Sequence, residues 1–82
     1  MSAKLTYFTA RWCAPCKNLK PKVRAICESR GVEMVEVDVD DDPVRATMAG
    51  IMSVPTVVVG GVALSGPLLT PTAIRELLDG EL

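Results

Sequence analysis

The residues best placed to carry chemistry are two cysteines, Cys13 and Cys16, which follow a strand-like segment at residues 5–9 and open a helical pattern. Unpaired backbone N–H groups and the helix dipole favour an anion at such a position. They are expected to lower the pKa of the Cys13 thiol and make it a nucleophile. Cys16 lies one turn further along, where we expect it to be less exposed. The spacing predicts a redox pair, in which Cys13 attacks a disulfide and Cys16 resolves the mixed disulfide.

Other uses of the cysteines fit less well. A zinc site needs about four ligands, and the chain has three cysteines and no histidine. Cys27 would lie about 16 Å beyond Cys16 along a helix, so it cannot complete a metal site there. We therefore expect no metal, and we expect Cys27 to be a small buried hydrophobe rather than a regulatory thiol. A purely structural disulfide remains an alternative, although it would not require a helix N-terminus.

Length and composition predict one globular domain spanning residues 1–82. The chain is 49% hydrophobic and 23% charged, with a net charge of -1, which argues against disorder and against nucleic-acid binding. No apolar run approaches the roughly 20 residues that cross a bilayer, and the N-terminus lacks the pattern of a signal peptide. We expect a cytoplasmic monomer that does not bind membranes.

Strands and helices alternate around the cysteine pair. Four segments have the β-branched or alternating composition of strands: residues 5–9, 32–39, 56–59 and 62–65. Three helices are expected, ending at Gly31, Gly50 and Gly80, with Asp42 capping the second and Thr70 or Thr72 the third. The order β-α-β-α-β-β-α predicts an α/β fold with a four-stranded mixed sheet flanked by three helices.

Details of the pattern refine this topology. Residues 32–39 alternate valine with acidic residues, which is typical of a half-buried or edge strand. Residues 56–59 are continuously apolar and should lie inside the sheet. Gly60 and Gly61 suit a two-residue hairpin turn, since both can adopt positive φ. Pro21 removes one backbone donor inside the first helix and predicts a kink there.

Charges are separated along the chain. Most basic residues lie between Arg11 and Arg30, and most acidic ones between Glu33 and Asp42. Two interpretations stay open: solvated faces of a helix and an edge strand, or a basic rim beside the cysteines that steers an acidic partner.

The segment WCAPCK at residues 12–17 resembles the WCGPCK motif of thioredoxins, with Ala14 in place of the usual glycine. Three further matches follow in the order of that family: Pro21 in the helix, SVPT at residues 53–56, and Gly66 after the hairpin. The resemblance covers roughly residues 5–78. In size the chain is closer to glutaredoxins and to the small redoxins that serve ribonucleotide reductase.

The resemblance implies a thioredoxin-like fold and a protein-disulfide reductase that acts through Cys13 and Cys16. A cis peptide bond is expected between Val54 and Pro55. The residues that it assigns to substrate binding are Trp12, Pro15, Val54, Pro55 and Gly66. It implies no bound cofactor, electrons from an NADPH-dependent flavoprotein similar to thioredoxin reductase, and disulfide-containing protein substrates, with ribonucleotide reductase as one candidate.

Two positions depart from the family. Thioredoxins carry a buried aspartate that helps to deprotonate the second cysteine, and Tyr7 stands at that position. The lysine that pairs with this aspartate is replaced by Glu36, which is either a substitute proton acceptor or, as its alternation with valines favours, a solvent-exposed residue.

Two other functions stay open. A glutathione-dependent glutaredoxin fits the size, although residues 62–65 offer only Ser65 as a polar group for glutathione. A redox-independent interaction module would dock a partner on an apolar rim of Trp12, Met52 and Val54.

Overall fold

The structure, a computed structural model, describes residues 3–81. Its elements, in order, are β1 (Lys4–Thr9), α1 (Ala14–Arg30), β2 (Glu33–Asp38), α2 (Pro43–Met48), β3 (Thr56–Val59), β4 (Val62–Ser65), the 3-10 helix η1 (Gly66–Leu68) and α3 (Pro71–Glu81). This order confirms the predicted β-α-β-α-β-β-α sequence, apart from the added turn of η1.

The four strands form one mixed sheet in the order β2-β1-β3-β4. β1 pairs with β2 in parallel, while β3 pairs antiparallel with both β1 and β4. The apolar strand β3 lies inside the sheet and the alternating strand β2 lies at its edge, as the composition of each predicts. Gly60 and Gly61 have φ values of 56° and 81° and close the β3–β4 hairpin.

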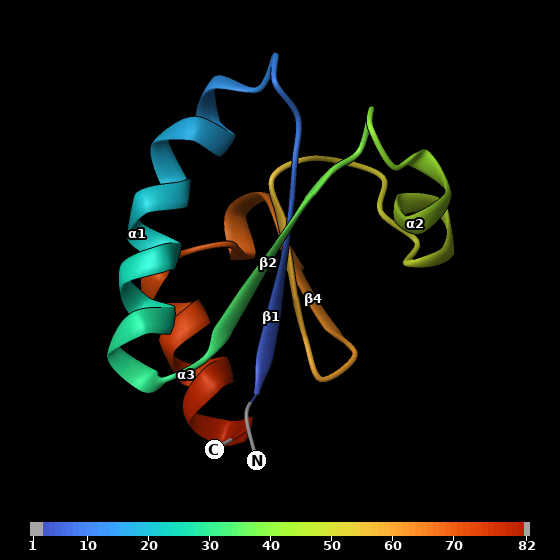
Figure 1. The fold of residues 1–82 in the computed structure, drawn as a ribbon. Coiled ribbons are helices and arrows are strands. Elements are labelled where there is room, and N and C mark those ends of the chain that lie inside the picture. Colours follow the sequence, from blue (N-terminus) through green and yellow to red (C-terminus); the bar gives the residue numbers. More distant parts are fainter. Residues whose placement is uncertain (1–2, 82) are drawn as a thin grey trace.

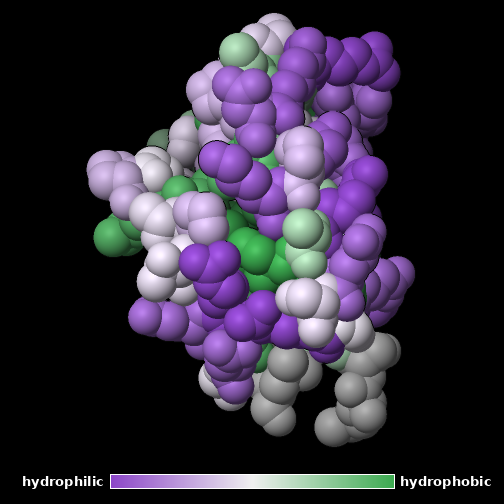
Figure 2. All heavy atoms as spheres, turned by 90° about the vertical axis from the view of Figure 1, so that its left-hand side faces the viewer, coloured by the Kyte–Doolittle hydropathy of each residue, from purple (hydrophilic) through white to green (hydrophobic). Residues whose placement is uncertain are grey.

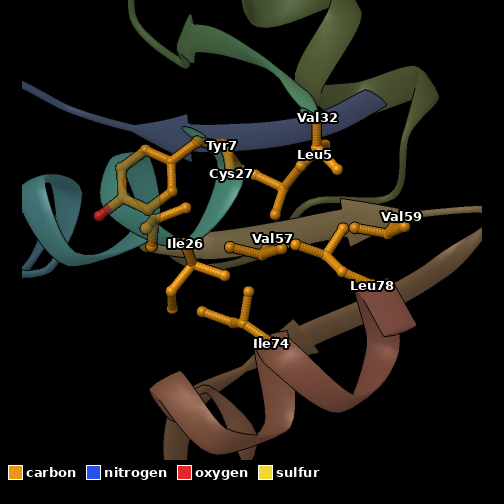
Figure 3. Packing of buried hydrophobic residues seen from close by; sticks show 10 residues of the cluster. Leu5, Tyr7, Ile26, Cys27, Val32, Val57, Val59, Ile74 and Leu78 are labelled. Carbon is orange, nitrogen blue, oxygen red and sulfur yellow. The ribbon is translucent and has the colours of Figure 1, made fainter. Parts of the chain in front are cut away.

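Helices α1 and α3 cover one face of the sheet, and α2 lies on the other face (Figure 1). The larger core fills the first interface (Figure 3), and its buried members are Leu5, Tyr7, Val23, Ile26, Cys27, Val32, Val57, Val59, Ile74 and Leu78. A smaller cluster of Phe8, Val37 and Ala46 joins α2 to the second face. On the α1 and α3 side, hydrophilic residues form most of the outer surface (Figure 2).

Helix α1 begins at the cysteine pair and ends at a glycine. Cys13 is its N-cap, and Pro15 occupies the first turn, where the missing N–H costs nothing. Gly31 takes a left-handed conformation with φ 64°, which allows its N–H to donate back to the end of the helix. The helix continues through Pro21 without interruption.

Two predicted boundaries were wrong. Helix α3 does not end at Gly80 but passes through it to Glu81, because Gly80 lacks the positive φ of a helix-terminating glycine. Strand β2 is one residue shorter at each end than the predicted residues 32–39: the N–H of Val32 donates to Cys27 at the end of α1, and Val39 already begins the turn, although its N–H still donates to Thr9. For α3, the N–H of Ala73 donates to Oγ1 of Thr70 at 3.1 Å, so Thr70 rather than Thr72 is the cap.

No helix within the described residues is long and apolar enough to cross a membrane.

Candidate functional site

A disulfide joins Cys13 and Cys16 at the N-terminus of α1. Their Cα atoms are 5.3 Å apart. Cys13 is 5% exposed and Cys16 fully buried, so Cys16 is the less exposed residue of the pair, as the sequence predicts. The pair sits just beyond the end of β1, where the N–H of Cys13 donates to the carbonyl of Ala10 at 3.1 Å.

The sulfur of Cys13 serves as the helix cap. The backbone N–H of Cys16 donates to Sγ of Cys13 at 3.2 Å. The first turn of α1 contains no acidic side chain to oppose a negative charge. A sulfur that accepts an N–H at the positive end of a helix dipole is in the environment that favours a thiolate once the disulfide is reduced.

The hydroxyl of Tyr7 contacts the backbone of Cys16. Tyr7 is fully buried in β1, and its Oη donates to the carbonyl of Cys16 at 2.7 Å. Burial, assisted by the nearby carboxylate of Glu36, raises the pKa of Tyr7 to about 12. The phenol therefore stays protonated at neutral pH and acts as a donor. The sequence marked Tyr7 only as a departure, and this hydrogen bond was not predicted.

Glu36 is exposed and paired with cations. It lies opposite Tyr7 in the β1–β2 register. Its carboxylate binds Nζ of Lys20 at 2.7 Å and Nη2 of Arg24 at 3.7 Å, and 38% of its side chain is exposed. Within residues 3–81, the carboxylate of Glu36 has no other hydrogen-bond or ion-pair partner. The favoured prediction, that Glu36 is exposed to solvent, therefore agrees with the structure.

The separated charges of the sequence meet in space. Besides the pairs with Glu36, Nη2 of Arg11 binds both oxygens of Asp41 at 3.0 and 2.8 Å, and Nε lies 3.8 Å from Asp38. The basic run of α1 and the acidic run of β2 thus compensate each other, which favours the interpretation of solvated faces over that of a free basic rim.

Trp12 borders one side of the disulfide. Trp12 is 70% exposed, and its Nε1 donates to Oδ2 of Asp40 at 2.7 Å. It lines a groove of about 170 Å³ together with Met52 and Val54. Met52 is 97% exposed, so the apolar rim expected from Trp12, Met52 and Val54 is assembled. The part played by Asp40 was not predicted.

A second hollow, of about 380 Å³, shares Val54 with the first. Pro15, Val54, Pro55 and Gly66 all line it. The Val54–Pro55 peptide bond is cis, as expected. Val54 borders both hollows, so the five predicted substrate-binding residues divide between them: Trp12 and Val54 line the first, and Pro15, Val54, Pro55 and Gly66 line the second.

Val54 also contacts the cysteines. It packs, with Val39, against the buried cluster of Ala10, Cys13 and Cys16. Within the described residues, no hydrogen bond engages the backbone N–H or carbonyl of Val54.

The third cysteine lies apart from the site. Cys27 is 1% exposed in the main core, and burial, with a smaller contribution from Glu28, raises the pKa of its thiol. The prediction of a small buried hydrophobe is confirmed. Within residues 3–81, no cluster of three or more metal-ligating side chains occurs.

Comparison with known sequences gives a consistent result. The family model described as Thioredoxin matches residues 2–63. A thioredoxin of Streptomyces clavuligerus is 42% identical over 53 residues, which is 63% of this chain and 50% of the relative. A thioredoxin of Listeria monocytogenes is 40% identical over 57 residues, or 67% of this chain and 55% of the relative. The chain thus spans about half the length of the curated relatives it matches.

Solved structures show the same fold. Thioredoxin 1 from Thermosipho africanus superposes with a TM-score of 0.82 at 20% identity, covering 95% of this chain and 92% of the other. A point mutant of a thioredoxin from Halobacterium salinarum gives a TM-score of 0.83 at 28% identity, covering 96% of this chain and 74% of the other.

Proposed function

Since the chain belongs to the thioredoxin family, we propose that it is a thiol–disulfide oxidoreductase that reduces protein disulfides through Cys13 and Cys16. One observation carries the proposal: a disulfide at a helix N-terminus in which the sulfur of Cys13, the less buried residue of the pair, accepts a backbone N–H. A purely structural bridge would not need that electrostatic setting.

The reaction begins with the dithiol form. The Cys13 thiolate attacks one sulfur of the substrate disulfide, forming a mixed disulfide and releasing the other substrate sulfur as a thiolate that takes up a proton. Cys16 then loses its proton, attacks the sulfur of Cys13 and releases the second substrate thiol. The substrate gains two electrons and two protons, and the protein is left with the Cys13–Cys16 disulfide.

Two features support docking beside Cys13. The two hollows meet at Val54, which packs against the pair, and the exposed ring of Trp12 extends the apolar surface. An extended substrate segment would pair with the free backbone groups of Val54, while its side chains enter the hollows. This binding mode suits unfolded or looped protein segments more than compact small molecules.

The proposal requires an external electron donor and no bound cofactor. A flavoprotein reductase that uses NADPH is the donor we propose, and disulfide-containing proteins, ribonucleotide reductase among them, are the proposed substrates. A reducing role suits the cytoplasm, where thiols are kept reduced. We propose a monomeric single domain that acts without metal, nucleic acid or membrane.

Reduction of insulin disulfides by the full chain tests the proposal, with thioredoxin reductase plus NADPH and glutathione plus glutathione reductase as parallel donors. Activity with the first donor is the expected result. Turnover with glutathione alone would replace the proposal with a glutaredoxin function.

Variants of the pair separate chemistry from docking. Cys13→Ser should abolish insulin reduction, and Cys16→Ser should accumulate a mixed disulfide on Cys13. A Cys13→Ser/Cys16→Ser protein that retained full biological function would show that the role is that of a redox-independent interaction module.

A further inference from the structure

We infer that Tyr7 is a positioning residue for Cys16, because its hydroxyl ties the carbonyl of the resolving cysteine to the sheet and keeps Cys16 within reach of Cys13 after the disulfide opens. The inference rests on the proposed redox role of the pair and adds a residue to its mechanism.

The sheet fixes the position of the hydroxyl. Tyr7 lies in β1 between two paired strands, opposite Glu36 on one side and Val57 on the other. Its ring is fully buried in the main core. At one end of that cluster the phenolic oxygen points out of the apolar side chains (Figure 3), and it meets the Cys16 carbonyl at 2.7 Å.

This bond is the main polar anchor of the first turns of α1. Within residues 3–81 it is the only side-chain hydrogen bond from the sheet to the backbone of α1. The nearest alternative link is the ion pair of Lys20 and Glu36, whose side chains are 29% and 38% exposed. A solvent-exposed ion pair holds two elements together weakly compared with a buried hydrogen bond.

The anchor matters more when the disulfide is open. In the oxidised protein the covalent bond itself holds Cys16 beside Cys13. In the dithiol and in the mixed disulfide that restraint is absent, and closure depends on the effective concentration of the Cys16 sulfur near Cys13. Loss of the hydroxyl therefore loosens the open forms more than the closed one. It should weaken disulfide formation and prolong the mixed disulfide.

The role requires no change in protonation of Tyr7. The charged group that acts on the phenol is Glu36, whose carboxylate is itself paired with Lys20 and Arg24. With a pKa of about 12, the phenol donates its proton throughout the neutral range. The effect of removing it should therefore be constant across that range, whereas a residue that exchanges protons with Cys16 would change the pH profile.

Tyr7→Phe tests the inference, with the dithiol–disulfide equilibrium against glutathione and the lifetime of the mixed disulfide as readouts. We expect the equilibrium constant for disulfide formation to fall by up to about fivefold, the factor reached if the whole of one hydrogen bond separates the two forms, and the mixed disulfide to persist several-fold longer. Both effects should be the same from about pH 6 to 8, well below the ordinary tyrosine pKa.

Two control variants distinguish a specific effect on the redox equilibrium from a general loss of stability. Ile26→Val trims a buried side chain of the same core. Ser29→Ala removes a hydrogen bond to the carbonyl of Ile26 near the far end of α1. Both should lower the free energy of unfolding and leave the redox equilibrium unchanged. An equilibrium shift in Ile26→Val as large as that in Tyr7→Phe would overturn the inference.

A second measurement covers the case in which Tyr7→Phe does not fold. Tyr7 is the only tyrosine, so biosynthetic replacement by 3-fluorotyrosine changes this residue alone, and the ring fluorine makes its hydroxyl a stronger donor. The equilibrium should then shift towards the disulfide, opposite to the effect of Phe. Wild-type values in either protein contradict the positioning role. Failure of the wild-type chain to form its disulfide under these conditions contradicts the proposed function instead.

Discussion

Nε1 of Trp12 donates to Oδ2 of Asp40 at 2.7 Å, joining the residue before the redox pair to the turn that follows β2. The turn is itself held by Asp38, whose Oδ1 accepts the backbone N–H groups of Asp40 and Asp41. The side chain of a tryptophan that is 70% exposed would otherwise sample several orientations. The acidic turn therefore fixes the orientation of the Trp12 ring, which lines the groove with Val54.

Asp40→Ala should remove the hydrogen bond that orients the Trp12 ring. We expect kcat/KM for insulin reduction to fall roughly two- to fivefold, the range for one partly exposed hydrogen bond, while the free energy of unfolding changes little. Trp12 is the only tryptophan, so a change in its fluorescence would report the altered orientation directly. Asp79→Ala, which removes an exposed carboxylate paired with Arg30, is the matched control. Unchanged kcat/KM in Asp40→Ala would show that the hydrogen bond does not orient the docking surface.

Trp12→Ala should affect protein substrates and spare the fold. Since most of the ring is exposed, its removal should change the free energy of unfolding by under about 1 kcal/mol. It should reduce kcat/KM for insulin by roughly tenfold, as the loss of an aromatic contact in a docking surface does. A small disulfide that does not reach the groove should lose much less. Equal losses for both substrates would place the function of Trp12 in the chemistry rather than in docking.

Tyr7 should dominate the loss of stability at high pH. Its pKa is raised from 10.0 to about 12 in the folded chain, so unfolding releases a proton above pH 10. The stabilisation is complete below pH 10 and is lost as the pH rises towards 12. Denaturant unfolding should show a weaker decline over this window for Tyr7→Phe than for the wild type. Tyrosinate absorbance, which reports this single residue, should show ionisation well above pH 10. A transition near pH 10 would mean that the phenol is not buried.

The thiol of Cys27 should be unreactive in the native protein and should take no part in catalysis. In the oxidised native protein its thiol is 1% exposed and its raised pKa disfavours the thiolate, so a thiol reagent should react only after unfolding. Cys27→Ala should cost about 1 kcal/mol of stability through the lost packing. Insulin reduction, measured under native conditions, should be unaffected. A loss of activity in this variant, with the fold intact, would indicate a regulatory thiol.

Local patterns predicted most of the fold. The alternation of β2, the apolar run of β3 and glycines such as Gly31 each mark one element within a few residues of sequence. The end of α3 was missed because Gly80 carries a helical backbone there, which residue type alone does not determine. Whether a glycine ends a helix depends on the hydrogen bonds that its neighbours make.

The site was predictable where its residues form a motif. Cys13 and Cys16 are neighbours on one helix turn, and their geometry follows from their spacing. The contacts of Trp12 with Asp40 and of Tyr7 with Cys16 cross 28 and 9 residues of chain. They depend on how β1, β2 and α1 pack together, which no short pattern encodes.

The central claim is that the start of α1 activates the sulfur of Cys13 and shields that of Cys16. It is tested most directly by the rate of iodoacetamide alkylation of each cysteine in the reduced, native protein near neutral pH, resolved by mass spectrometry. We expect rapid labelling of Cys13, with a pH midpoint below that of free cysteine, slow labelling of Cys16 and none of Cys27. Labelling of Cys13 no faster than free cysteine, or of Cys16 before Cys13, would contradict it.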